Sequence, residues 1–109
     1  MTVDEIKAAI PHRPPMLLVD EVSNRSESTI TTKKTFRENE FFLQGHYPDR
    51  PIVPGIILCE VCMQSGAILL AQLADEGLPV ATRMNNVRFR QLVNPNETVE
   101  VHVRLVERL

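Results

Sequence analysis

The stretch PGIILCEVCMQSGAILLAQLADEG, residues 54–77, decides the fold. It begins with Pro54 and closes with Gly77, the order that favours a helix start and a helix end. Apolar side chains occupy nearly every face between them, so the helix must be buried on most sides. We therefore predict one long central helix from Pro54 to about Glu76, closed by Gly77 and Pro79.

Strand candidates lie on both sides of this helix. The patterns rich in β-branched or alternating apolar residues are Met16–Val22, Ser28–Phe36, Thr82–Leu92 and Thr98–Glu107. Turns are expected at Asn24–Ser26 and at Asn94–Asn96. An antiparallel sheet wrapped around one helix, an α+β architecture, is the simplest way to combine these elements.

Two further segments complete the chain. Thr2–Ile10 is predicted to form a short helix, because Thr2 followed by Glu5 matches a capping box. Arg37–Pro54 contains several prolines and few periodic apolar residues, so we expect a stiff loop with one helical turn at Glu38–Phe42. Long ordered loops in compact domains are often functional.

Composition narrows the classes of function. The 109 residues fit one domain, and a net charge of −2 argues against a dedicated nucleic-acid binder. Cys59 and Cys62 are expected to be buried thiols in a reducing cytoplasm rather than a disulfide framework. Glu60 interrupts the apolar helix, which argues against a membrane span. We expect a soluble cytoplasmic protein.

Two side chains stand out as chemical groups. His46 lies in the stiff loop, and Glu60 lies in the second turn of the helix among apolar neighbours. A histidine is a natural general base near neutral pH, and a poorly solvated carboxyl group is a natural general acid. The Gly55 N–H at the helix start could hold a carbonyl oxygen. Gln64, one turn after Glu60, could orient the Glu60 carboxyl group by a hydrogen bond.

Structural interpretations of the same residues remain open. His46 alone could be a structural loop histidine, and Glu60 alone could face an interface or solvent. His12 and His102 are expected to be structural. The arginines Arg83, Arg88 and Arg90 first indicate a solvated strand face.

Three stretches, in the same order as in the family, resemble 3-hydroxyacyl-acyl-carrier-protein dehydratases of the FabZ type. The central stretch is GHYPDRPIVPG (residues 45–55), followed by Leu58-Cys59-Glu60 and Gln64. The flanking stretches are IPHRPPMLLVD (residues 10–20) and NVRFRQLV (residues 86–93) with Pro95. Together the matches cover nearly the whole chain, and the central match is long and specific.

This resemblance implies a hotdog fold across residues 1–109, without the last strands of the family pattern. It implies dehydration of (3R)-hydroxyacyl thioesters on acyl carrier protein to trans-2-enoyl thioesters in fatty acid biosynthesis, with no metal or organic cofactor. His46 would be the base, Glu60 its acid partner from the opposite subunit of a homodimer, and Gly55 and Gln64 substrate-binding residues. Related enzymes that also isomerise carry Asp at position 60, so Glu60 favours dehydration alone.

The sequence departs from the family pattern at several places. Asp49 replaces a usual glycine, Asn96-Glu97 replaces a usual Gly-Asp turn, and Cys59, Cys62 and Met63 replace aliphatic residues that would line the acyl tunnel. A hotdog thioesterase and a non-catalytic acyl-binding or assembly module are the alternative functions.

An acidic carrier protein would dock on basic side chains. Arg88 and Arg90 alternate in a predicted strand and would share a face, and Arg50 lies near the active-site loop. We predict that these three arginines form the docking patch.

Overall fold

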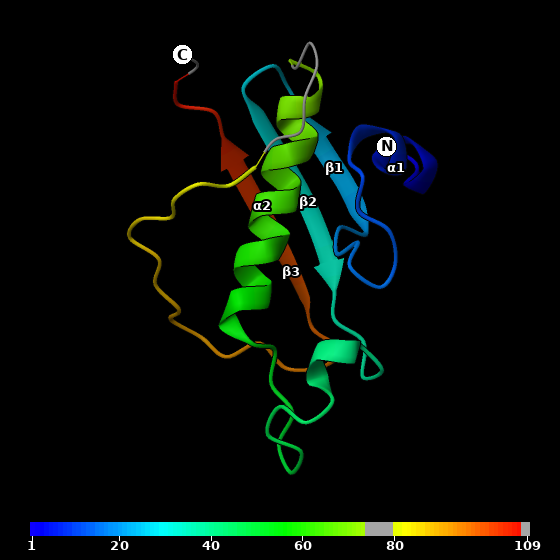
Figure 1. Ribbon diagram of the computed structural model, residues 1–109, viewed down its shortest axis with the longest axis vertical. Coiled ribbons are helices and arrows are strands. Elements are labelled where there is room, and N and C mark those ends of the chain that lie inside the picture. The colour runs from blue at the N-terminus through cyan, green and yellow to red at the C-terminus, as the bar shows by residue number, and fades with distance from the viewer. Residues whose placement is uncertain (74–79, 108–109) are drawn as a thin grey trace.

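The computed structural model describes residues 1–73 and 80–107, in which one long helix crosses a face of an antiparallel sheet (Figure 1). The sheet of the described residues has three strands in the order β1-β2-β3. In chain order the elements are α1 (Val3–Ala9), β1 (Glu21–Arg25), β2 (Thr29–Thr35), the 3₁₀ turn η1 (Phe41–Leu43), α2 (Gly55–Ala71) and β3 (Thr98–Arg104). The predicted α+β class is confirmed.

Helix α2 joins the sheet through one buried polar contact and two apolar clusters. The Ser65 and Thr32 hydroxyl oxygens lie 2.7 Å apart, and Ser65 Oγ also donates to the Val61 carbonyl. One cluster joins the second half of α2 to α1, β1 and β2 through Ile6, Ile10, Val19, Val22, Ile30, Ile68 and Leu69. The other joins its first half to the strands and the following loop through Leu18, Phe36, Leu43, Val53, Val61 and Val101.

The predicted ends of the helices agree only in part with the structure. Helix α1 has the expected capping box, with Thr2 and Glu5 bonded to each other's backbone N–H. Helix α2 begins after Pro54 as predicted but ends at Ala71 instead of Glu76. Its last turn tightens through a hydrogen bond from Leu73 N–H to the Leu70 carbonyl. The predicted closure at residues 77 and 79 lies outside the described residues.

The first hairpin is shifted toward the C-terminus relative to the prediction. Strand β2 lies within the predicted Ser28–Phe36, but β1 begins at Glu21 rather than Met16. Residues 16–18 remain outside the sheet because their N–H groups bond elsewhere, those of Met16 and Leu17 to the Arg13 carbonyl and that of Leu18 to the Gln64 side chain. Asp20 already donates its N–H to the Lys33 carbonyl of β2. The pairing also contains a bulge between Val22 and Asn24.

The predicted strand at Thr82–Leu92 is wrong. Residues 80–92 form no strand and every one of them is exposed. Figure 1 shows this segment following a separate path from β3. In the described residues β3 pairs only with β2, so the segment has no neighbouring strand against which to bury alternate side chains.

The turn at Asn94–Asn96 and the strand after it agree better with the sequence. Asn96 has a φ of 71°, a left-handed conformation that asparagine tolerates better than most residues. Strand β3 starts at Thr98 as predicted but ends at Arg104, before Glu107. Its alternation is confirmed, since Val101 is buried between exposed neighbours.

A buried ion-pair network fixes the start of the loop that follows β2. Lys34 is 4% exposed, and its Nζ lies 2.7 Å from Glu40 Oε2 and 3.7 Å from Asp20 Oδ1. The other Asp20 oxygen accepts a hydrogen bond from the Thr35 N–H at 2.8 Å. The single helical turn of this loop then forms at Phe41–Leu43, three residues later than the predicted Glu38 start.

We predict that Lys34→Met lowers the free energy of unfolding by about 3 kcal/mol, because it leaves the largely buried Glu40 carboxylate without its cation. Urea denaturation measures this loss. Lys33→Met, one residue earlier on the other face of β2, is the matched control and should cost less than about 0.5 kcal/mol. Equal losses in the two variants would contradict the importance of the network.

Candidate active site

Glu60 projects from the second turn of α2 and is held by one hydrogen bond. Its side chain is 26% exposed, and Oε2 accepts from Gln64 Nε2 at 3.0 Å. The two residues are four apart and therefore share one face of the helix. The hydrogen bond expected from their spacing is thus present, while a role for Gln64 in substrate binding stays a prediction.

Three hydrogen bonds fix the orientation of the Gln64 side-chain amide. The residue is 1% exposed, and its Oε1 accepts from the Leu18 N–H at 2.8 Å. Its Nε2 donates to the Met16 carbonyl at 2.7 Å as well as to Glu60. Both amide hydrogens are used, so the amide cannot flip without losing all three bonds. Glu60 Oε2 is therefore held, whereas its Oε1 accepts no hydrogen bond from the described residues.

His12 lies beside the same carboxylate. Its Nε2 is 3.8 Å from Glu60 Oε2, and its buried Nδ1 has no hydrogen-bond partner in the described part of the chain. Together with Glu60 and Gln64 it lines a pocket of about 420 Å³, here called the Glu60 pocket. The other lining residues are Met63, Gly66, Ala67, Leu70, Val80 and Ala81.

The sequence did not predict this position of His12, for which a structural role was expected. A signal was available, because His12 stands within residues 10–20, one of the three stretches that resemble the dehydratases. What the sequence did not reveal is that residues 16–18 are bonded to α2 through Gln64, which brings the N-terminal segment to Glu60.

His46 lies in the loop before α2 with one ring nitrogen engaged. Its Nδ1 is 2.9 Å from the Ile52 carbonyl oxygen, and its ring packs edge-on against Tyr47 with centroids 4.8 Å apart. A carbonyl oxygen can only accept, so in the neutral ring Nδ1 carries the hydrogen and Nε2 has the lone pair. The next residue, Tyr47, has a strained φ of 53°. The local fold thus prepares Nε2 to accept a proton.

The structure does not bring His46 and Glu60 together within this chain. No hydrogen bond or ion pair connects them among residues 1–73 and 80–107, and His46 is not among the residues that line the Glu60 pocket. Their pairing and their catalytic roles stay predictions.

Gly55 is the first residue of α2, and the Phe89 ring lies directly over it. A Cβ at position 55 would lie only 2.9 Å from the nearest Phe89 ring atom. The Gly55 N–H has no hydrogen-bond partner in the described residues, as is usual at a helix N-terminus. The Phe89 ring therefore occupies the space that a side chain at position 55 would need.

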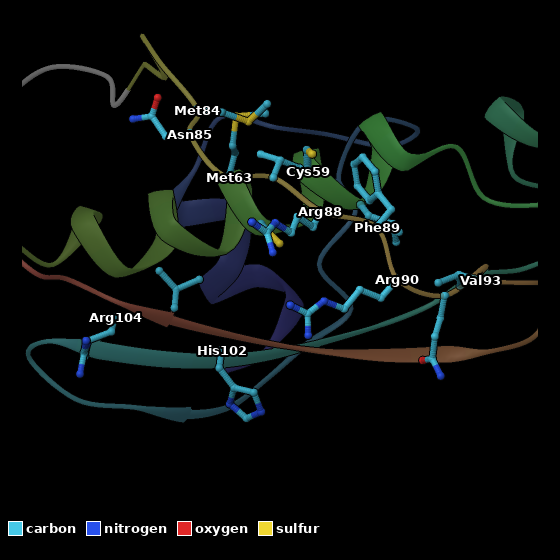
Figure 2. Close-up of a pocket in the computed structure, with 15 residues that line it drawn as sticks. Cys59, Met63, Met84, Asn85, Arg88, Phe89, Arg90, Val93, His102 and Arg104 are labelled. Carbon is cyan, nitrogen blue, oxygen red and sulfur yellow. The ribbon is translucent and has the colours of Figure 1, made fainter.

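A cleft of about 1150 Å³ lies between α2, the segment from Met84 to Val93, and β3 (Figure 2). Three residues expected in the acyl tunnel line it, namely Cys59, Cys62 and Met63. Arg88 and Arg90 also line the cleft. They were predicted to lie in a strand, but the structure places them in no strand. Arg50 is exposed in the loop after His46, with its N–H bonded to the Tyr47 carbonyl, and is not among the cleft residues.

The two cysteines differ in environment. Both are free thiols; Cys59 is buried as expected, but Cys62 is exposed to the cleft, which corrects the prediction for that residue. The walls of the cleft and α2 still displace much of the water around Cys62. This desolvation, with a smaller contribution from Cys59, raises the pKa of the Cys62 thiol above its ordinary value.

A helix held against an antiparallel sheet, with a carboxylate in its second turn and a histidine in the loop before it, agrees with the predicted hotdog architecture. Residues 22–108 match the ApeI-like family, described as ApeI dehydratase. A solved structure, the dehydratase heterocomplex ApeI:P from Xenorhabdus doucetiae, has a TM-score of 0.80 at 19% identity. The match covers 99% of this chain and 73% of that one, and it confirms the hotdog fold.

Curated relatives are named 3-hydroxyacyl-[acyl-carrier-protein] dehydratase FabZ. The protein of Pseudothermotoga lettingae is 38% identical over 108 residues, covering 99% of this chain and 77% of the relative. That of Oleidesulfovibrio alaskensis is 40% identical over 111 residues, covering 97% and 72% respectively. The chain therefore belongs to the FabZ family of hotdog dehydratases.

None of the helices in the described residues is both long enough and apolar enough to cross a membrane.

We predict that Gln64→Leu lowers the free energy of unfolding by about 3 kcal/mol. The change leaves the buried Leu18 N–H and the partly buried Met16 carbonyl without their partner, and an orphaned buried group costs about 1–3 kcal/mol. Chemical denaturation gives the value. Gln72→Leu, which removes one exposed bond to the Ser26 carbonyl, should cost less than about 1 kcal/mol. A Gln64 variant as stable as the Gln72 variant would show that the buried amide is dispensable.

Proposed function

We propose that this chain dehydrates (3R)-hydroxyacyl thioesters carried on acyl carrier protein to trans-2-enoyl thioesters, as a step of fatty acid biosynthesis, with His46 as general base and Glu60 as general acid. Membership of the FabZ family supports the reaction. The observation that carries the assignment of the base is the Nδ1 contact of His46 with the Ile52 carbonyl, which leaves Nε2 able to accept a proton.

In the proposed reaction His46 Nε2 removes a proton from C2 of the substrate. The electrons of that C–H bond form the C2–C3 double bond, and the C3 hydroxyl group leaves with the proton of Glu60 as water. Glu60 Oε1 is the donor, because Oε2 is held by Gln64. The free Gly55 N–H holds the thioester carbonyl as negative charge develops on its oxygen. Each proton removed by one side chain is balanced by one supplied by the other.

The pair would form between two copies of the chain in a homodimer. Two observations support this arrangement: no contact joins His46 and Glu60 in the described residues of one chain, and large apolar side chains remain exposed on the segment that borders the cleft. Among them are Val87, Phe89 and Leu92, which are 46%, 57% and 58% exposed. Exposed apolar surface of this kind is typical of protein interfaces.

The acyl chain would occupy the cleft next to α2, where Cys59, Cys62 and Met63 provide its lining. Arg88 and Arg90 at the same cleft, with Arg50 on the loop after His46, would receive the acidic carrier protein. Figure 2 shows the Arg88 and Arg90 side chains on the segment that faces α2 and β3.

We predict that His46→Ala and Glu60→Gln each lower turnover by about 10²–10⁴-fold, because each removes one proton-transfer group. The assay follows enoyl-thioester formation and its reverse, hydration, on crotonyl and longer carriers. Glu100→Gln is the control, since Glu100 is exposed on β3, contacts His102 and does not line the cleft. Hydrolysis of the thioester in place of dehydration would indicate a thioesterase. Absence of both activities with retained acyl binding would indicate a binding module.

Mixing the two inactive variants tests the shared site. Subunit exchange would restore some sites that contain both intact residues, so activity should partly return. Proven exchange without any recovery would contradict a site formed by two chains.

Charge reversal at Arg88 and Arg90 should weaken activity on carrier-linked substrates, most strongly at low salt, because electrostatic docking is screened by ions. Small thioester analogues, which need no carrier docking, should react at nearly the normal rate. The kcat/KM ratio for the two substrate types at several salt concentrations provides the measurement. Equal losses on both would exclude a docking role.

A further inference from the structure

His12 has no part in the proposed reaction, although it lies next to the proposed acid. Its Nε2 is 3.8 Å from Glu60 Oε2, a distance at which a small side-chain rotation forms a hydrogen bond. Catalytic hydrogen bonds are often long in a structure without substrate and shorten when the site is occupied. The ring is largely buried and lines the Glu60 pocket. An inference about His12 rests on the proposed function of Glu60.

The burial of the other ring nitrogen indicates where the hydrogen of a neutral His12 lies. Nδ1 is inaccessible and has no hydrogen-bond partner in the described residues. A buried N–H without an acceptor is rarer than a buried acceptor without a donor. The neutral ring therefore carries its hydrogen on Nε2, the nitrogen that faces Glu60, where an acceptor is available.

We propose that His12 is a positioning residue that donates from Nε2–H to Glu60 Oε2. Gln64 Nε2–H already donates to this oxygen at 3.0 Å, so one N–H group of α2 and one of the segment between α1 and β1 face it. Two donors on Oε2 occupy its acceptor positions, so the acidic hydrogen stays on Oε1. His12 thereby selects which oxygen of Glu60 faces the departing hydroxyl group. His12 does not itself exchange a proton with the substrate.

Nuclear magnetic resonance of the native protein tests the contact without any assay of activity. The ¹⁵N shifts of His12 should show a protonated Nε2 and an unprotonated Nδ1, and Glu60→Gln should move the Nε2 signal. Glu100→Gln is the matched control, because Glu100 contacts another histidine, His102, at 2.8 Å. It should leave the His12 signals unchanged. A hydrogen on Nδ1, or a Nε2 signal indifferent to Glu60→Gln, overturns the proposal.

Kinetics test the positioning role. His12→Leu, which is similar in volume but has no donor, should lower kcat by about 10–100-fold with little change in KM. His12→Gln, which restores an N–H donor, should recover most of that loss. In a Glu60→Gln background His12→Leu should have no further effect, because the acid it positions is gone.

The outcomes separate the two proposals. Additive losses in the double variant, with no recovery by His12→Gln, would show that His12 only fills space and would overturn its role. An enzyme without dehydratase activity would instead disprove the proposed function, while the resonance measurement would still decide whether His12 contacts Glu60. Thermal unfolding of each variant identifies any that fail to fold.

Discussion

The buried side-chain amide of Gln64 is the contact on which the arrangement around Glu60 depends. It lies on the central helix, yet two of its three hydrogen bonds go to the backbone of residues 16–18. The third goes to Glu60. Because a buried amide must satisfy all its polar atoms, the path of the N-terminal segment and the orientation of the carboxylate are set by the same group. His12 reaches Glu60 only because this segment is held against the helix.

Other contacts hold α2 and the loop that contains His46 in place. Apolar clusters on the two halves of α2 hold it to the sheet, and the loop that contains His46 is fastened at its start by Lys34 and Glu40. At the far end of that loop the Val53 N–H donates to the Val93 carbonyl. The loop is therefore fixed at both ends, although most of its residues between these points are exposed. Such a loop can hold the His46 ring in one place although much of the loop faces solvent.

Local patterns in the sequence were sufficient to predict the elements that depend mainly on neighbouring residues. The capping box at Thr2, the proline before α2, the β-branched strand β2 and the alternation in β3 all appear as expected. The segment Thr82–Leu92 has the composition of a strand, but a strand also requires a neighbour, and the sequence does not show whether one is present. The bond between Gln64 and Glu60 followed from helical spacing. The proximity of His12 did not, since it depends on contacts between residues about 50 positions apart.

The contact between Gly55 and Phe89 has a consequence for how such sequences can vary. The two positions are far apart in the chain, yet the ring occupies the space that any side chain at 55 would need. A side chain at position 55 would therefore have to displace this ring from its present place, although neither residue is fully buried. Across homologous sequences, a larger residue at 55 should coincide with a smaller one at 89. The effect of a substitution at either position would then depend on the residue at the other position, which is epistasis caused by side-chain shape.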